Sequence, residues 1–311
     1  MPRACGQLTR RDERFAHSRV MPRRPHKPAA LRGQCFLGSE AVRAGLLTRR
    51  QLCSQGWRKF GHDVYADADL GDTHLVRCRA IGLVLPSGAA ITGRSAACLD
   101  GLPIDQKDAL VHVLAPLGTR LERPQCRVAR TGWLPHGHIR PGSDPPVTAS
   151  TRTAWEIASE SDVVEAVVAL DVLFRANRPR QEAMGSWVAA YPDSAAASAI
   201  ALADGRSESP QESRARVRIV LEGFPPPTPQ YEVVANGRFV ARVDLAWPEV
   251  KVAVEYDGAW HAEPGQMAKD RARLNRLMDA GWTVLHLTSA TLKHPSLFAA
   301  FCAQLRSALG V

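Results

Sequence analysis

Three carboxylates stand on two adjacent stretches of predicted β-strand, and they constrain this chain more than any other feature of its sequence. Asp244 lies on one strand, and Glu255 and Asp257 lie on the next, within the segment from Arg242 to His261. A carboxylate on an apolar strand costs free energy unless a cation neutralises it. Hard divalent cations prefer oxygen ligands. The segment therefore predicts a Mg²⁺ site and, with it, hydrolysis of phosphodiester bonds.

Strand geometry predicts how these groups meet. Residues two apart on a strand point to the same face, so Glu255 and Asp257 share a face, with Asp244 nearby on the antiparallel neighbour. A metal ion held by these three carboxylates would activate a water molecule and stabilise charge on the scissile phosphate. His261 is a candidate general base or general acid. Trp260 is a candidate platform on which a base could stack.

The same carboxylates also have structural explanations. Asp244 could form an ion pair with Arg242 or Lys251, and Asp257-Gly258 could form an Asx turn. For any one carboxylate alone the structural explanation is favoured, whereas the whole set favours a functional site.

The last hundred residues predict the element order α-β-β-β-α-β-α. Ser209-Pro210-Gln211-Glu212 is a capping box, so Glu212 has a capping role beside its candidate catalytic one. Asn236-Gly237 predicts a two-residue hairpin turn. A later helix carries a basic stripe in which Arg273 is a candidate DNA contact, although a solvated face explains the stripe equally well. The expected elements are helix 209–222, strands 230–234, 239–246 and 251–256, helix 265–280, strand 282–288 and helix 296–309.

A second candidate site lies near the N-terminus. A short helix over 39–44 and a turn precede Thr48, which predicts the N-cap of a helix running to about Lys59, and a strand over 63–66 follows. Helix, turn, helix and strand is the order of a winged helix. The structural alternative is a surface helix with solvated charges. The candidate contacts to phosphates and base edges are Arg49, Arg50, Gln51 and Arg58.

Charge and cysteine usage limit the class of protein. The net charge of +9 favours a polyanionic partner, but residues 1–34 alone supply +7 of it. The seven cysteines contain no Cys-x-x-Cys pair, which argues against a zinc finger or a disulfide framework and favours a reducing cytoplasm. The apolar runs are too short to span a bilayer, so no membrane partner is expected.

These observations predict an α+β protein with four regions. Residues 1–34 are a basic tail, 35–70 a winged helix, 71–205 a mixed helical region and 206–311 an αβββαβα domain. The small, Ala-rich stretch before Gly205 marks the expected boundary of the last domain.

The C-terminal motifs resemble a known family. Ser-Pro-Gln-Glu-Ser, Val-Asp-Leu-Ala-Trp-Pro-Glu, Val-Glu-Tyr-Asp-Gly and Gly-Trp-Thr-Val-Leu are similar to a bacterial family related to very-short-patch-repair endonucleases, in the PD-(D/E)XK superfamily. The resemblance implies a restriction-endonuclease-like fold, a metal-binding Asp244, Glu255 and Asp257 at the second acidic position, and a catalytic His261. Glu212 matches a helix carboxylate near that site. Asp257 stands where the superfamily has a lysine.

The N-terminal motifs more loosely resemble abortive-infection antitoxins of the AbiEi type. The matching marks are Ala44-Gly45-Leu46-Leu47-Thr48-Arg49-Arg50-Gln51-Leu52, Val64-Tyr65 and Ile91-Thr92-Gly93-Arg94-Ser95-Ala96. This resemblance implies a winged helix and regulation of transcription.

Together these features predict a cytoplasmic, Mg²⁺-dependent DNA endonuclease or nickase with a winged-helix module. The alternative is an antitoxin-like regulator whose nuclease-like domain binds DNA without cleaving it. The sequence does not distinguish DNA from RNA as the polymer, and a toxin or repair partner remains unidentified.

Overall fold

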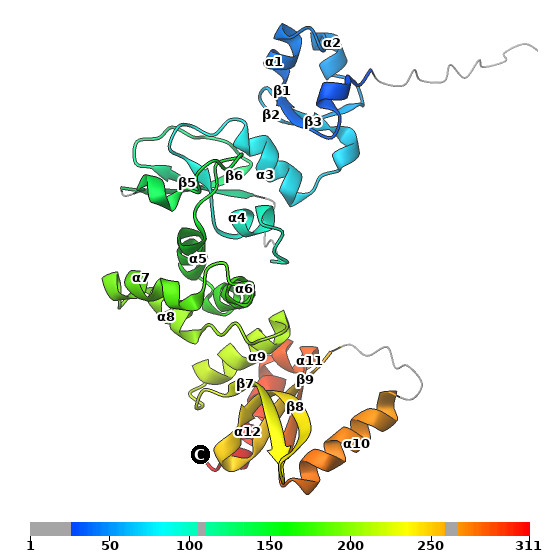
Figure 1. Ribbon diagram of the computed structural model, residues 1–311, viewed down its shortest axis with the longest axis vertical. Helices are drawn as coiled ribbons and strands as arrows, with labels where there is room; N and C mark the ends of the chain where they lie inside the picture. Colours follow the sequence, from blue (N-terminus) through cyan, green and yellow to red (C-terminus); the bar gives the residue numbers. More distant parts are fainter. Residues whose placement is uncertain (1–25, 105–109, 133, 259–265) are drawn as a thin grey trace, which may run out of the picture.

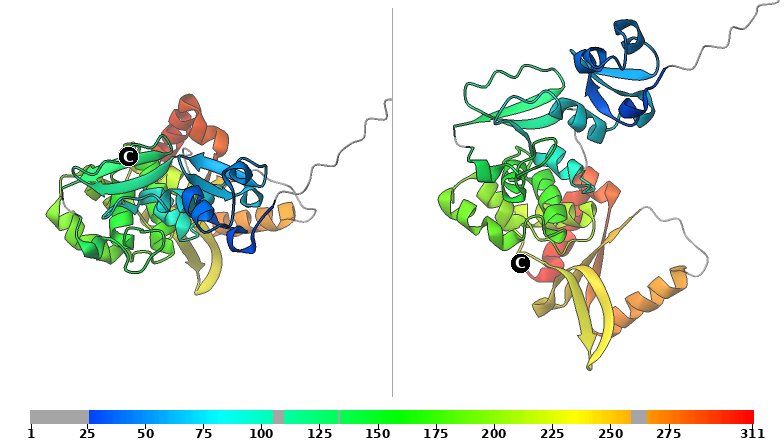
Figure 2. Two further views of the ribbon diagram at one scale, coloured as in Figure 1. Left: turned by 90° about the horizontal axis from the view of Figure 1, so that it is seen from above. Right: turned by 45° about the horizontal axis from the view of Figure 1, so that its top comes forward.

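The chain has a mixed α+β architecture, as its sequence predicts. The computed structural model describes residues 26–104, 110–132, 134–258 and 266–311, and within them the strands form three small sheets. In Figure 1 the N-terminal elements lie at the top, helices α5 to α8 in the middle and the C-terminal sheet at the bottom. The right-hand view of Figure 2 shows the same succession. Every helix of these described stretches is too short or too polar to cross a membrane.

The N-terminal elements form a small sheet covered by two short helices. The antiparallel sheet has the order β1-β3-β2, and Phe36 and Trp57 pack edge to face beneath it with ring centroids 5.1 Å apart. The elements are η1 (Ala29–Leu31), β1 (Cys35–Leu37), α1 (Gly38–Arg43), α2 (Arg49–Leu52), β2 (Trp57–Gly61), β3 (Val64–Asp67) and η2 (Ala68–Leu70).

The predicted helix from Thr48 to Lys59 is wrong in its second half. Helix α2 ends at Leu52, and β2 pairs with β3, so that Trp57 lies opposite Asp67. Pairing with a neighbouring strand buries Trp57, and this tertiary contact outweighs the helical pattern of the sequence.

The middle region combines a second small sheet with a helical core. Strand β5 lies between β4 and β6, and it pairs with β6 in parallel. Helices α5, α6 and α8 enclose an apolar core that includes Ile157, Leu170 and Leu173. The elements are α3 (His74–Gly82), β4 (Ala90–Ile91), α4 (Gly93–Leu99), β5 (Val111–Pro116), β6 (Cys126–Thr131), η3 (His136–His138), α5 (Ser150–Ala158), α6 (Val163–Arg175), η4 (Gln181–Met184), α7 (Gly185–Ala190) and α8 (Ala195–Leu202).

The C-terminal elements follow the predicted αβββαβα order, with two short additional helices, η5 and α11. The sheet has the order β10-β9-β8-β7, in which β9 and β10 are parallel and the other pairs antiparallel. Helices α9 and α12 pack on one face of this sheet, and α10 packs on the other (Figure 1). The elements are α9 (Pro210–Leu221), β7 (Thr228–Ala235), β8 (Arg238–Trp247), η5 (Pro248–Val250), β9 (Val252–Asp257), α10 (Gln266–Asp279), β10 (Thr283–Thr288), α11 (Ser289–Lys293) and α12 (Pro295–Leu309).

Helix α9 belongs to two cores at once. Its Val217 is buried with the helices of the middle region, whereas Ile219 packs against the C-terminal sheet. The buried Arg216 donates to Asp171 of α6, with Nη2 and Oδ2 2.7 Å apart. The chain before α9 is also tightly packed, because a Cβ on Gly205 would lie 2.8 Å from a backbone nitrogen of α6. The middle region and the C-terminal sheet are therefore joined through a shared helix.

Candidate active site

The candidate site begins where strands β8 and β9 separate. Their last paired residues are Leu245 and Val254, and beyond this pair the Asp244 carboxylate takes the place of a backbone acceptor. Asp244 Oδ2 accepts a hydrogen bond of 2.9 Å from the backbone N–H of Tyr256. The alternation of β8 also breaks at this point, because Val243 and Leu245 pack into cores on opposite faces of the sheet. Asp244 is thus built into the backbone geometry of the site.

Helix α9 brings a second carboxylate to Asp244. Glu212 is 8% exposed and accepts a hydrogen bond of 2.8 Å from the backbone N–H of Glu208. The side-chain amide of Gln230 links the two acids, since its Nε2 lies 2.8 Å from Glu212 Oε2 and 3.4 Å from Asp244 Oδ1. Glu212 therefore lies in the site as well as in its capping turn.

Gln230 is a site residue that the sequence does not reveal. It adopts the left-handed backbone conformation, with φ of 50°, within strand β7. Such a conformation is unfavourable for a residue with a side chain and commonly marks a functional constraint. The preceding Pro-rich segment indicates a turn, but nothing in the local pattern indicates that this amide reaches Asp244.

The surroundings of Asp244 disfavour its negative charge. The pKa of Asp244 is raised to about 6, chiefly by burial and in smaller part by the nearby carboxylates of Glu212 and Glu255, whereas the hydrogen bonds from Tyr256 and Gln230 act in the opposite direction. Part of this site therefore titrates close to neutral pH. A bound cation would relieve the repulsion among the three acids.

Glu255 is held by an arginine from the opposite helix. Arg273 of α10 donates from Nη1 to Glu255 Oε1 at 2.6 Å and from Nη2 to the other carboxylate oxygen. The sequence predicts Arg273 as a DNA contact on a basic stripe, and the structure places its guanidinium on the buried carboxylate. Arg273 also donates to the carbonyl of Arg242 at 3.4 Å, which ties α10 to β8.

Asp257 shares the face of Glu255, as period-two alternation predicts, but has a separate partner. Its carboxylate oxygens lie 3.1 and 3.2 Å from Nδ1 of His286, on the neighbouring strand β10. Its side chain is 38% exposed. The structure thus brings Glu212, Asp244 and Glu255 together and places Asp257 beside them in its own pair.

The basic residues considered as partners for Asp244 lie elsewhere. Arg242 pairs with Glu208 at 2.8 Å. Lys251 stands at the start of β9, where its Nζ donates to the carbonyl of Ala280 at 3.2 Å. Lys251 therefore does not supply the lysine that the resemblance to nucleases calls for.

The other predicted residues are distributed as follows. His261 and Trp260 lie outside the described residues. Arg49 and Arg50 are exposed on α2. The side chain of Gln51 closes the capping box, with its Oε1 2.7 Å from the backbone nitrogen of Thr48. A capping role therefore explains Gln51 without a nucleic acid.

The donor set is chemically suited to a hard cation. Glu212, Asp244 and Glu255 offer carboxylate oxygens, the ligand type that Mg²⁺ prefers. Within the described ranges, no three His, Cys, Asp or Glu side chains already stand close enough together to hold a metal. Binding would require Glu255 to share its oxygens with Arg273 and the amide of Gln230 to turn. The residues fit the ion in chemistry and need a side-chain rearrangement to enclose it.

Comparison with known proteins places the chain in a family. The uncharacterized proteins MT2308 and Rv2248, from Mycobacterium tuberculosis strains CDC 1551 / Oshkosh and ATCC 25618 / H37Rv, are each 32% identical to it over 254 residues. The match covers 77% of this chain and 89% of each relative. This chain belongs to their family. No protein-family model matches it. The names of these mycobacterial relatives state no activity.

Proposed function

We propose that the C-terminal domain hydrolyses phosphodiester bonds in DNA with the help of Mg²⁺. The observation that carries the proposal is the meeting of Glu212, Asp244 and Glu255, from α9, β8 and β9, where the β8–β9 ladder opens. Such a gathering of acids destabilises a fold that has no use for it.

The residues of the site have distinct roles in this proposal. Glu212, Asp244 and Glu255 would hold the ion. Bound Mg²⁺ supplies a polarised water and stabilises charge on the phosphate. The backbone N–H of Tyr256 fixes one oxygen of Asp244 and leaves the other toward Gln230. Arg273, once it shares Glu255 with the ion, retains guanidinium donors for a phosphate oxygen.

The N-terminal elements support DNA as the polymer. They have the helix-turn-helix and β-hairpin order of a winged helix, and Arg49 and Arg50 are exposed on the second helix. Exposed arginines at a helix start are suited to phosphate and base contacts.

Binding without cleavage is the second candidate function. Two observations favour it. Glu255 is already neutralised by Arg273. Lys251 lies just before the first residue of β9, away from the acids, and donates to the carbonyl of Ala280. A domain of this kind would act as a DNA-binding regulator.

A nicking assay separates the two functions. Purified full-length protein is incubated with supercoiled plasmid, with single-stranded DNA and with RNA, each with Mg²⁺ or with EDTA. Cleavage is expected with Mg²⁺ only, and Asp244→Asn is expected to reduce its rate at least about 100-fold, because the principal charged ligand is lost.

Glu232→Gln is the matched control, since it removes an exposed carboxylate from the neighbouring strand β7. It is expected to cleave as the unchanged protein does. Retained binding to plasmid without cleavage of any of the three substrates would overturn the proposal of an enzyme and support a DNA-binding regulator. Cleavage of RNA alone would support phosphodiester hydrolysis but would contradict DNA as the substrate.

A further inference from the structure

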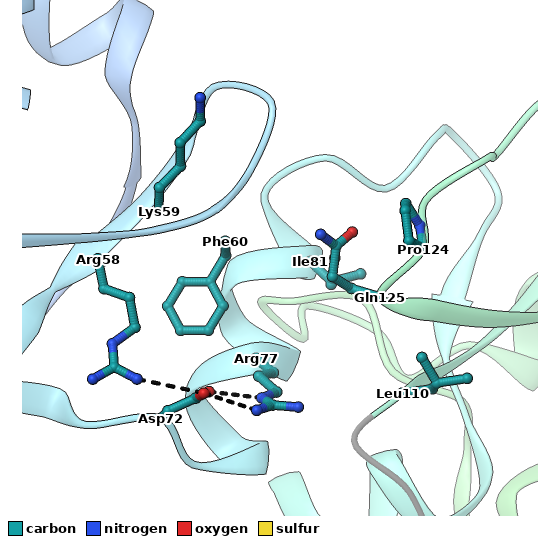
Figure 3. Close-up of a pocket in the computed structure, with 9 residues that line it drawn as sticks. All are labelled: Arg58, Lys59, Phe60, Asp72, Arg77, Ile81, Leu110, Pro124 and Gln125. Atoms are coloured by element: carbon teal, nitrogen blue, oxygen red, sulfur yellow. Dashed lines mark hydrogen bonds and ion pairs between the residues drawn. The ribbon is translucent and has the colours of Figure 1, made fainter. Parts of the chain in front are cut away.

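A cavity lies between the N-terminal sheet and the middle region, in a part of the chain separate from the acidic site. Its volume is about 370 Å³, within the range of pockets that hold small molecules. Strand β2 forms one wall, helix α3 another, and residues next to β5 and β6 close it (Figure 3). The lining residues are Arg58, Lys59, Phe60, Asp72, Arg77, Ile81, Leu110, Pro124 and Gln125.

One side of the cavity carries a surplus of positive charge. Asp72 lies between two arginines, and Arg77 satisfies both of its oxygens, with Nε to Oδ1 at 2.7 Å and Nη2 to Oδ2 at 2.8 Å. Arg58 reaches the same carboxylate more loosely, at 3.4 Å, and its side chain is 40% exposed. The hydrogen bond from Arg77 lowers the pKa of Asp72 below its usual value, so the carboxylate is ionised at neutral pH. The three side chains together keep one positive charge and leave Arg58 able to bind an anion.

The other side of the cavity is apolar and ends in an amide. In Figure 3 the ring of Phe60 lies beside Arg58 and above Arg77, and the apolar residues Ile81, Leu110 and Pro124 lie across the cavity from Arg58. Gln125 offers an amide donor and acceptor beside that wall. Lys59 points away from the other side chains in this view, so it adds no direct contact. A flat ring, an anion and one hydrogen-bonding edge are the features that this lining complements.

We propose that this cavity binds a nucleoside monophosphate. The base stacks on Phe60, the phosphate bonds to Arg58 and competes with Asp72 for it, and Gln125 contacts an edge of the base. The ligand is either a free mononucleotide or the terminal nucleotide of a single strand, because both present a base and a phosphate. An occupied cavity would fix the N-terminal sheet against the middle region, since its lining comes from both. This proposal does not depend on cleavage by the C-terminal domain.

Calorimetric titration of the full-length protein with AMP and GMP tests the proposal, with EDTA present so that the acidic site takes no part through a metal. Binding with a dissociation constant at or below about 1 mM is expected. Adenosine and inorganic phosphate are each expected to bind at least about tenfold more weakly, because each lacks one half of the contacts. A 5′-phosphorylated trinucleotide distinguishes the two sources: equal or tighter binding assigns a strand terminus, and much weaker binding assigns the free nucleotide.

Substitutions in the cavity are expected to change the affinity for AMP in opposite directions. Arg58→Gln and Phe60→Leu are expected to weaken AMP binding roughly tenfold, whereas Asp72→Asn is expected to tighten it a few-fold by removing the competing carboxylate. Arg43→Gln, an exposed arginine on α1, is the control and is expected to change nothing. Circular dichroism confirms that each variant folds. Absence of binding at several millimolar, or equal loss in Arg43→Gln and Arg58→Gln, would overturn the proposal.

Discussion

Asp171 and Asp244 are both carboxylates withdrawn from water, and helix α9 supplies a neighbour to each. At Asp171 the neighbour is Arg216, and at Asp244 it is Glu212, one helical turn earlier. Burial raises the pKa of both aspartates, but Arg216 counteracts the effect at Asp171, whereas the acids around Asp244 add to it. A buried cation thus accompanies the carboxylate of Asp171, whereas the charged groups that act on Asp244 are two further carboxylates.

Removing the buried acid from the structural pair is expected to have the largest effect on stability. Asp171→Ala leaves Arg216 buried without its carboxylate, and the expected loss in the free energy of unfolding is about 3 to 5 kcal/mol. Urea denaturation followed by circular dichroism measures it. Glu182→Ala, an exposed acid on η4, is the control. A loss below about 1 kcal/mol would show that the pair does not join α6 to α9 as described.

Arg273→Ala is expected to destabilise the candidate site by removing the cation that neutralises Glu255. It leaves Glu255 buried beside Asp244 with no guanidinium, and the expected loss is about 2 kcal/mol in EDTA. Added Mg²⁺ is expected to restore more stability to this variant than to the unchanged protein, because the ion replaces the lost charge. Thermal unfolding with and without Mg²⁺ measures the difference. Equal stabilisation of both proteins would mean that Arg273 and the ion do not share a site.

Asp244→Asn is expected to stabilise the protein at neutral pH. The raised pKa means that the folded state binds the proton more tightly than the unfolded chain does. The carboxylate therefore costs no stability below about pH 4. The cost grows between about pH 4 and about pH 6 and is fully present above that range. The variant, which keeps an acceptor for Tyr256, is expected to gain about 1 to 2 kcal/mol at pH 7.5 and close to nothing at pH 4. Urea denaturation at the two pH values measures the gain, and a loss at pH 7.5 would contradict it.

The sequence predicts much of the C-terminal fold because its signals are local. The N-cap at Ser209 and the Asn236-Gly237 turn each act within a few residues, and the structure follows both. The second half of the predicted capping box does not form, because the Glu212 carboxylate accepts from the backbone N–H of Glu208 instead of Ser209. The helix predicted to extend to Lys59 fails because pairing of β2 with β3 is a tertiary effect.

The site is predictable in part for the same reason. Period-two alternation relates Glu255 to Asp257, but it says nothing about which neighbour each carboxylate meets. Arg273 and His286 reach the two acids from other elements. The position of the Gln230 side chain depends on the left-handed backbone conformation of this residue inside a strand, a conformation that its surroundings impose.

Calorimetric titration with Mg²⁺ at pH 7.5 tests most directly the proposal that Glu212, Asp244 and Glu255 bind a divalent cation. The full-length protein is expected to bind the ion, Asp244→Asn and Glu212→Gln to weaken binding at least about tenfold, and Asp257→Asn, whose carboxylate faces His286, to weaken it less. Glu232→Gln is expected to leave binding unchanged. Absence of Mg²⁺ binding, or equal binding by the unchanged protein and Asp244→Asn, would contradict the account.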